Sequence, residues 1–353
     1  MKYILVILLF ALSLHAHEKH EKPTWYRGNT HAHTTLCGHA DSHPDVVAKW
    51  YLDNGYNFLI LSEHNIFIDP KTVNLPKERR KDYILVPGQE VTGTKHIHTT
   101  AMNTKKLVPW KFDHKDKSKI IQNHVHGINK QGGHAILNHP NFKKALTHHD
   151  IFKVKDLYMF ELYNSHPHVD NNGNDKVKST EKTWDILLSK GMTIYGVSSD
   201  DAHHFKKRTP WFSNPGRGWV MVNSNGKLTP DALTDAMFKG HFYSSNGVFL
   251  KVCHKNEKEY TVEIDDDATR KEIAKKHVRG KKVKTEDGYQ IDFIVDDGKV
   301  ISSQKGLKGH LKVPKGIKYL RVKISYTKDN EQFYAWGQPV FLDGRNKKHK
   351  HQH

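Results

Sequence analysis

Histidine and carboxylate residues recur along this chain in six short motifs, most of them directly after an apolar run. In chain order the motifs are His31-Ala32-His33, Ser62-Glu63-His64, Gly88-Gln89-Glu90, His96-Ile97-His98, Asn138-His139-Pro140 and Asp201-Ala202-His203. The apolar runs at 57–61, 83–86, 135–137 and 192–197 are typical of strands. Strand ends that meet at one rim would bring these imidazoles and carboxylates together. The pattern therefore predicts a multinuclear metal site and favours metal-dependent hydrolysis.

The first motif places two imidazoles on one face. His31 and His33 are two residues apart, and side chains at i and i+2 of a strand point the same way. Imidazole and carboxylate ligands without a thiolate suit Zn, Mn or Fe. Glu90 or Asp201 can bridge two such cations, and paired metals activate a water for an in-line phosphoryl displacement. We therefore expect two or three divalent metal ions (Zn, Mn or Fe) as cofactors.

Strands and helices alternate from about residue 25 to residue 246, and this alternation would position the motifs. The predicted helices cover 44–54, 119–131, 181–190 and 230–239. Ser42, Ser118 and Thr229 precede three of them as expected caps. Repeated βα units form barrels or open sheets, and chemistry at the ends of many different strands fits a TIM-like barrel better. We expect an α/β metallohydrolase domain over residues 24–247.

The sequence pattern changes after about residue 248. Runs in which every second residue is apolar appear at 290–295, 320–326 and 333–341, and residues that typically begin or end helices become sparse. The stretch 266–277 is compatible with a helix or a loop. We expect a small all-β, sandwich-like domain over residues 248–345, without a catalytic role.

The N-terminus predicts export. Lys2 precedes an apolar run over 3–14, which is followed by Ala16 and a polar stretch. Such a run is too short to span a bilayer comfortably and is typical of a signal peptide. We expect a signal peptide over residues 1–16, a secreted or periplasmic mature protein, and no transmembrane segment after cleavage. Residues 346–353 form a His/Lys-rich tail for which we expect only incidental metal affinity.

The chain is strongly basic, with 56 Lys and Arg against 38 Asp and Glu and a net charge of +18. Such a surface attracts anions, and a small phosphorylated substrate is the expected partner. Nucleic acid is less favoured, because the lysines are dispersed and no aromatic platform is interleaved with them. Arg208 and Arg217 follow the last motif and are candidates for a bidentate phosphate contact, with a solvated basic loop as the alternative. Cys37 and Cys253 are expected to be isolated thiols rather than a disulfide.

Taken together, the motifs resemble the polymerase and histidinol phosphatase (PHP) family of metal-dependent phosphoesterases. The matching stretches are NTHAHTTLCGHA, LILSEHN, VPGQEVT, HIHTTAMN, ILNHP, GVSSDDAHH and, more weakly, KGHFYSSNG. They span residues 29–247. The resemblance implies a distorted (β/α)7 barrel and usually three metals. It also implies three ligand groups: His31, His33, Glu90 and Asp201; Glu90, His98 and His139; and His39, His64 and His203. Within this site Glu90, Asp201 and His203 would be the catalytic residues.

Some positions keep an alternative: Asp41 for His39, His96 for His98, and Asp200 for Asp201. The spacing to His203 favours Asp201, and Glu63 is expected to support the site rather than bind metal. His124 and His126 fall in the predicted helix 119–131 and are expected at the surface.

The leading hypothesis is a secreted phosphoesterase that hydrolyses phosphomonoesters or phosphodiesters with a metal-activated water. A second hypothesis keeps the fold and changes the bond to a carboxylic or carbamate ester. A third is a non-catalytic, histidine-rich metal-binding protein, against which Glu90 and Asp201 count because it predicts no ordered carboxylate partners.

Overall fold

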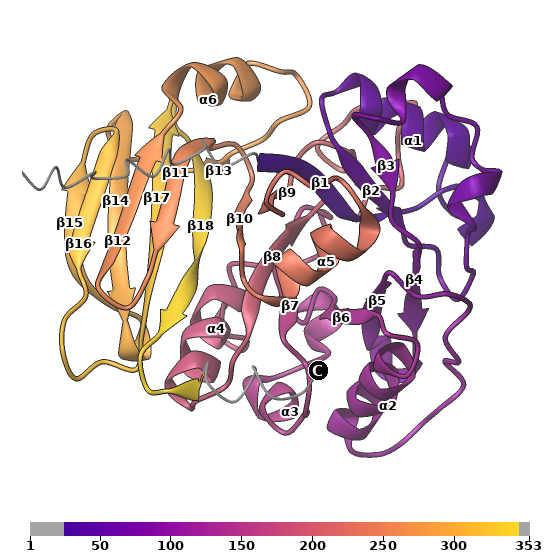
Figure 1. The fold of residues 1–353 in the computed structure, drawn as a ribbon, viewed down its shortest axis with the longest axis horizontal. Coiled ribbons are helices and arrows are strands. Elements are labelled where there is room, and N and C mark those ends of the chain that lie inside the picture. Colours follow the sequence, from indigo (N-terminus) through magenta and orange to yellow (C-terminus); the bar gives the residue numbers. More distant parts are fainter. Residues whose placement is uncertain (1–24, 346–353) are drawn as a thin grey trace, which may run out of the picture.

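Strands dominate the architecture, which is mixed α/β and contains three sheets (Figure 1). The computed structural model describes residues 25–345, so the predicted signal peptide and the His/Lys-rich tail lie outside the described residues. No helix in the described range is long and apolar enough to cross a membrane. The C-terminal strands, orange to yellow in Figure 1, stand side by side at one end of the molecule, and β4 (Gly88–Thr92), β5 (His98–Met102) and α2 (Lys117–Asn129) lie at the other.

The largest sheet has ten strands and contains both the first and the last strand of the described residues. Its order is β15 (Lys299–Lys305), β14 (Gly288–Val295), β17 (Tyr319–Lys328), β18 (Glu331–Phe341), β10 (Phe242–Ser245), β9 (Trp219–Asn223), β1 (Trp25–Ala32), β2 (Phe58–Leu61) and β3 (Ile84–Leu85), with β13 (Lys281–Lys282) paired to β18. The β1–β2 and β2–β3 pairs are parallel, and β9, β10 and β18 are antiparallel to their neighbours. Because β10 pairs with β18, backbone hydrogen bonding continues across the predicted domain boundary at residue 247.

The second sheet has five strands in chain order: β4, β5, β6 (His134–Leu137), β7 (Met159–Asn164) and β8 (Tyr195–Ser199). Its first pairs are antiparallel and its last two pairs are parallel. Single bridges between Ala32 and Ala202 and between His64 and Glu90 connect it to the ten-stranded sheet. Buried side chains of both sheets, among them Phe58, Val220 and Phe160, form a common core.

The expected α/β class is thus confirmed, but the described strands form two facing sheets rather than one clearly closed (β/α)7 barrel. One reason is that β4 and β5 are joined by residues 93–97, a segment too short for a crossover helix, so this pair is antiparallel. The sequence pattern had predicted alternating strands and helices through this part of the chain.

The third sheet, β11 (Leu250–Lys255), β12 (Glu259–Ile264) and β16 (Lys308–Lys312), packs on the C-terminal strands of the large sheet. Tyr260 and Val262 of β12 share a buried cluster with Phe293 and Ile324 of the large sheet, as in a sandwich. The stretch left open by the sequence contains the helix α6 (Asp266–Ile273).

The remaining helices are α1 (Pro44–Asp53), α3 (His148–Phe152), α4 (Thr180–Ser189) and α5 (Pro230–Phe238). Thr229 caps α5 as predicted, because its hydroxyl accepts from the backbone N–H of Ala232. The caps predicted for α1 and α2 were wrong by one or two residues. His43 rather than Ser42 precedes α1, and Asp116 rather than Ser118 accepts the free N–H at the start of α2. The acceptor in each case is the residue directly before the first helical residue: α1 begins at Pro44, and α2 begins at Lys117, so Ser118 lies inside its first turn.

Candidate metal centre

The nine residues predicted as ligands come together at neighbouring strand ends of the two facing sheets. His31 lies next to the last residue of β1, and His33 directly follows that strand. Glu90 lies in β4, His98 begins β5, and His64, His139 and Asp201 follow β2, β6 and β8. His39 and His203 lie in the adjacent loops. Most are buried, and only His39 is exposed. We call these nine residues the metal cluster.

The first group consists of His31, His33 and Asp201. The Nε2 atoms of the two imidazoles lie 3.1 Å apart, and each lies 3.3 Å from Oδ1 of Asp201. Ligand atoms bonded at about 2.0–2.1 Å to one ion are separated by about 3.0 Å in an octahedral site and about 3.4 Å in a tetrahedral one. The observed triangle therefore fits a single divalent cation.

Glu90 lies at the middle of the cluster. Its Oε1 is 3.3 Å from Nε2 of His31, and its Oε2 is 2.5 Å from Nδ1 of His64. The same Oε1 is also 3.2 Å from Nδ1 of His98 and 3.3 Å from Nε2 of His139. Burial opposes ionisation of this carboxyl, but the rings of His98, His64 and His31 hold its pKa well below the usual range. An ionised carboxylate with imidazoles on both oxygens is placed to bridge two cations.

The third group is formed by His39, His64 and His203. The ring centroids of His39 and His203 lie 4.7 Å apart, and those of His39 and His64 lie 5.2 Å apart. His39 donates from Nδ1 to the carbonyl of Cys37 at 3.1 Å, and His203 donates from Nδ1 to the carbonyl of Asp201 at 2.9 Å. These bonds leave Nε2 of both rings as a free lone pair. In His203 that atom is buried and without a hydrogen-bond partner, which fits the role of a metal ligand.

Backbone strain marks two of the cluster residues. His139 has φ +22° and Asp201 has φ +50°, values that a residue with a Cβ atom rarely adopts. The strained peptides are held in place, because the N–H of His139 donates to Glu161 at 2.6 Å and that of Asp201 donates to the carbonyl of His31 at 2.9 Å. Strain maintained by surrounding contacts at a side-chain cluster is typical of functional sites.

Sequence reasoning missed Glu161, which supports the cluster from β7. Its Oε1 accepts from Nδ1 of His31 at 2.7 Å and from Ser199 at 2.5 Å, and its Oε2 accepts from Asn164 at 2.8 Å. A carboxylate that binds the outer nitrogen of an imidazole fixes its tautomer and directs the other nitrogen at a metal. The signal was present in the chain: a glutamate inside an apolar strand must be paired when it is buried.

The alternative ligands turn away from the cluster. Asp41 accepts from the backbone N–H of Phe205 at 2.9 Å. Asp200 accepts from the hydroxyl of Tyr51 at 2.8 Å and from three backbone N–H groups. His96 is exposed and lies outside the cluster. These placements leave His39, Asp201 and His98 as the residues directed at the site.

Two further predictions need correction. Arg217 does not offer its guanidinium to a phosphate, because it is buried and donates within the fold to the carbonyls of Thr209, Phe212 and His277 and to the side chain of Asn214. Arg208 is exposed, which agrees with the alternative of a solvated basic loop. His124 is not at the surface: it is buried, and its Nδ1 lies 3.0 Å from the hydroxyl of Thr99. His126 is exposed, as expected.

A cavity of about 650 Å³ adjoins the metal cluster. One wall contains Asn164, which donates to Asp201 at 3.2 Å, and His166, whose ring lies 5.8 Å from that of His203. The rest of the lining includes Tyr163 of β7, Tyr334 and Trp336 of β18, whose rings stack, and the exposed cations Arg279 and Lys281. The cavity thus combines an aromatic surface with positive charge beside the cluster.

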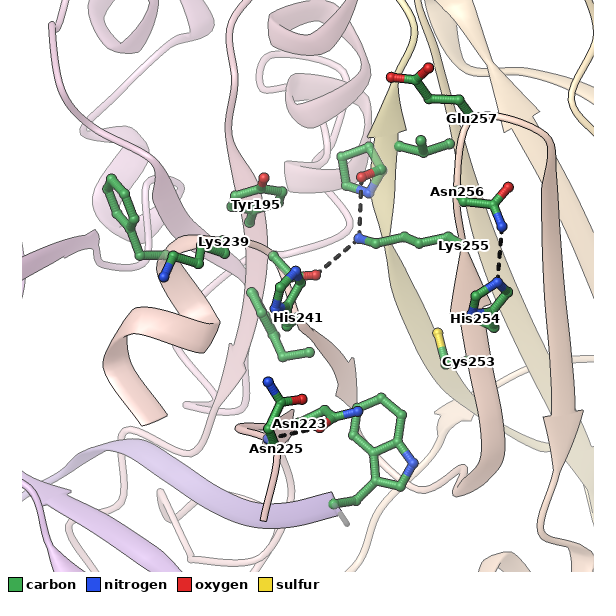
Figure 2. A pocket seen from close by; sticks show the side chains of 16 residues that line it. Tyr195, Asn223, Asn225, Lys239, His241, Cys253, His254, Lys255, Asn256 and Glu257 are labelled. Atoms are coloured by element: carbon green, nitrogen blue, oxygen red, sulfur yellow. Dashed lines mark hydrogen bonds between the residues drawn. The ribbon is translucent and has the colours of Figure 1, made fainter. Parts of the chain in front are cut away.

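A larger cavity, of about 930 Å³, lies elsewhere and is lined by none of the cluster residues (Figure 2). Lys255 enters it from β11 and donates to the carbonyls of Gly240 at 3.0 Å and Pro339 at 3.2 Å. Burial lowers the pKa of this amine to about 7. The two carbonyl contacts tie β11 to β10 and β18, and we assign the cavity no part in the chemistry of the cluster.

Two solved structures show a remote likeness to this chain. No family profile and no curated protein matches the chain. A solved two-domain protein containing a predicted PHP-like metal-dependent phosphoesterase, from Bacteroides vulgatus, is 13% identical with a TM-score of 0.46, over 89% of this chain and 95% of that chain. Native alpha-2-macroglobulin from Escherichia coli, spanning domains NIE–MG1, is 8% identical with a TM-score of 0.16, over 35% of this chain and 48% of that chain. Neither likeness is close enough to bear on function.

Proposed function

We propose that this protein is a metal-dependent phosphoesterase that uses two or three divalent metal ions, Zn, Mn or Fe, held by the metal cluster. One observation carries the proposal: the buried carboxylate of Glu90 lies within 3.3 Å of imidazoles on both of its oxygens. Four imidazoles around one carboxylate, with a second carboxylate opposite, form a donor set for cations rather than an internal ion-pair network.

Once bound, paired divalent metals supply a Lewis acid for the phosphoryl oxygen and a water that ionises near neutral pH. The residues of the chain fix the geometry of that chemistry. Glu90 and Asp201 provide the negative charge that keeps neighbouring cations close. Glu161 keeps the proton of His31 on Nδ1, so that Nε2 faces the site. Bonds from Nδ1 to backbone carbonyls do the same for His39 and His203.

The substrate is proposed to be an anionic ester whose leaving group occupies the 650 Å³ cavity. Stacked Tyr163 and Trp336, with ring centroids 5.7 Å apart, offer a surface for a planar or sugar-like group. Arg279 and Lys281 are exposed residues of the same cavity lining and favour a negatively charged ligand. In this proposal the C-terminal strands contribute to substrate binding without entering the chemistry.

A panel of chromogenic esters tests the proposal. Phosphomonoester, phosphodiester and carboxylic ester nitrophenyl substrates are assayed with the metal-loaded protein, the chelator-treated protein and the Glu90→Gln variant. We expect hydrolysis of phosphate esters by the loaded protein only. Cleavage of carboxylic esters alone would contradict a phosphoesterase and support a carboxylic ester hydrolase on the same fold. Full metal loading without any hydrolysis would support a non-catalytic metal-binding protein.

Export is a separate proposal that rests on residues 1–16. Mass analysis of the protein recovered from the periplasm or medium should show a chain that begins near residue 17. An intact Met1 on cytoplasmic protein would contradict export.

A further inference from the structure

Cys37 lies against the metal cluster, in a position that the sequence did not indicate. It ends the short 3-10 helix η1 (Thr35–Cys37) between His33 and His39, and it is half-buried and unpaired. Its Sγ and one ligand nitrogen each from His39 and His203 all lie within 4.8 Å of one another. The sulfur is therefore close enough to share a cation with two imidazoles of the third ligand group.

Unpartnered buried atoms surround the same sulfur. His203 is 5% exposed, and its Nε2 has no hydrogen-bond partner. On the inner side, His33 and Glu63 form a second group with Cys37 within 4.8 Å. Nδ1 of His33 and Oε2 of Glu63 lie 3.7 Å apart as an ion pair, and both are buried without a hydrogen bond. Buried polar atoms that form no hydrogen bond require an explanation, and a role as metal ligands provides one.

The imidazoles next to Cys37 are already oriented as ligands. The Nδ1 atoms of His39 and His203 are occupied by backbone carbonyls, so only the Nε2 atoms can bind an ion. One of those carbonyls belongs to Cys37 itself. The turn that carries the sulfur thus also sets the orientation of one imidazole beside it.

We propose that Cys37 is a thiolate ligand which, with His39 and His203, completes a mixed sulfur and nitrogen site at the outer edge of the metal cluster. The inference rests on the proposed metal centre and deepens it. In the structure the thiol of Cys37 donates a hydrogen bond to the carbonyl of Thr34, with Sγ and O 3.2 Å apart. On metal binding the thiol would release its proton to solvent, lose this hydrogen bond and form a metal–sulfur bond. Softer ions are favoured, so this position takes Zn or Fe in preference to Mn. The ligand groups around Glu90, which offer imidazole nitrogens and carboxylate oxygens but no sulfur, have no thiolate to add to that preference.

Cobalt absorption tests the assignment on the full-length protein. Cobalt(II) replaces zinc in such sites, and a thiolate ligand adds a near-ultraviolet charge-transfer band to the visible d–d bands. Cys253 is the matched control, because it is the other cysteine of the chain and its sulfur lies 3.8 Å from the hydroxyl of Tyr260, away from the cluster. The tail 346–353 contains no cysteine and cannot contribute to the charge-transfer band.

Wild type and Cys253→Ser should show the charge-transfer band, whereas Cys37→Ser should lose it, keep visible d–d bands and bind one zinc fewer. X-ray absorption of the zinc-loaded wild type, which needs no variant, should show sulfur at about 2.3 Å from zinc. Retention of the band in Cys37→Ser, or cobalt-loaded wild type without a band and without zinc–sulfur scattering, would overturn the proposal. Cobalt that does not bind at all would overturn both this inference and the metal centre. A sulfur-ligated protein that hydrolyses no ester would overturn only the proposed phosphoesterase activity.

Discussion

Two buried clusters of charged side chains stand at different places in this molecule, and they are built on opposite principles. The first surrounds Arg321 of β17, which is 1% exposed; it is made of Arg321, Asp185, Glu181, Lys323 and Tyr319, and we call it the arginine cluster. Arg321 donates from Nε and Nη2 to both oxygens of Asp185 at 2.8 Å, and Lys323 donates to Glu181 at 2.7 Å. Cations and carboxylates are matched, so the arginine cluster is complete by itself.

The metal cluster is not matched in this way. Imidazole nitrogens face one another, as do those of His31 and His33 at 3.1 Å, and Nε2 of His203 has no partner. No lysine or arginine within the described residues forms an ion pair with Glu90 or Asp201. A buried cluster in which every donor has an acceptor stabilises the fold, whereas one with lone pairs turned inward needs cations from outside. The comparison therefore distinguishes charged side chains that hold the fold together, in the arginine cluster, from charged side chains placed to bind metal, in the metal cluster.

The largest effect is expected for Glu90→Gln, which keeps the size of the side chain and removes its charge. Without that anion, neighbouring cations repel each other, and the water they activate near pH 7 reverts toward its ordinary pKa. Metal content should fall, and phosphoesterase rate at neutral pH should drop by at least about a thousandfold. Glu63→Gln is the matched control, since Glu63 is equally buried. A greater loss of metal and rate in the control than in Glu90→Gln would refute the ligand assignment.

Arg321→Leu should damage the fold and spare the chemistry. It leaves the carboxylate of Asp185 buried without its bidentate partner, and breaking such a pair costs about 3–5 kcal/mol. Urea denaturation should show this loss, and the folded fraction should keep its full metal content. Arg270→Leu, which removes an exposed pair with Asp266, should change stability by less than about 0.5 kcal/mol. Equal losses of stability in the two variants would erase the contrast between the clusters.

His124 sharpens the comparison, because it is a buried histidine behind the metal cluster that is held neutral. Burial lowers its pKa from 6.5 to about 4. A depressed pKa in the folded state means that its contribution to stability is complete above pH 6.5 and is lost as the pH falls toward 4. At 1.36 kcal/mol per pKa unit, the loss is about 3 kcal/mol. Denaturation of the metal-free protein from pH 7.5 to 4.5 should therefore be less steep for His124→Gln than for wild type, and parallel curves would refute this reading.

The smallest effect is expected for Glu161→Gln. The amide still reaches Nδ1 of His31 but no longer bears a negative charge, so His31 becomes a weaker ligand. Loss of such an outer partner typically lowers metal affinity about 10–100-fold. Zinc titration with a competing chelator measures the change. An affinity equal to that of wild type would show that Glu161 supports only the backbone of His139.

The sequence predicted what depends on local spacing. The i, i+2 pair His31 and His33 does face one site, and Thr229 does cap α5. Contacts that depend on the tertiary fold were missed. The role of Glu161 depends on the fold bringing it to His31, which is distant in the chain. Arg217 was predicted to contact phosphate, but in the fold its guanidinium donates to carbonyl groups such as that of Phe212. Continuous pairing of β10 with β18 could not be read from strand propensity, because register is set by partners distant in the chain.

Metal content tests the central claim most directly. The protein should be purified without residues 346–353, so that the histidines of that tail cannot add metal ions to the count. After incubation with Zn or Mn and removal of unbound ions, elemental analysis should give two or three ions per chain for wild type and fewer for Glu90→Gln. Less than one ion per chain in the wild-type protein would contradict the account.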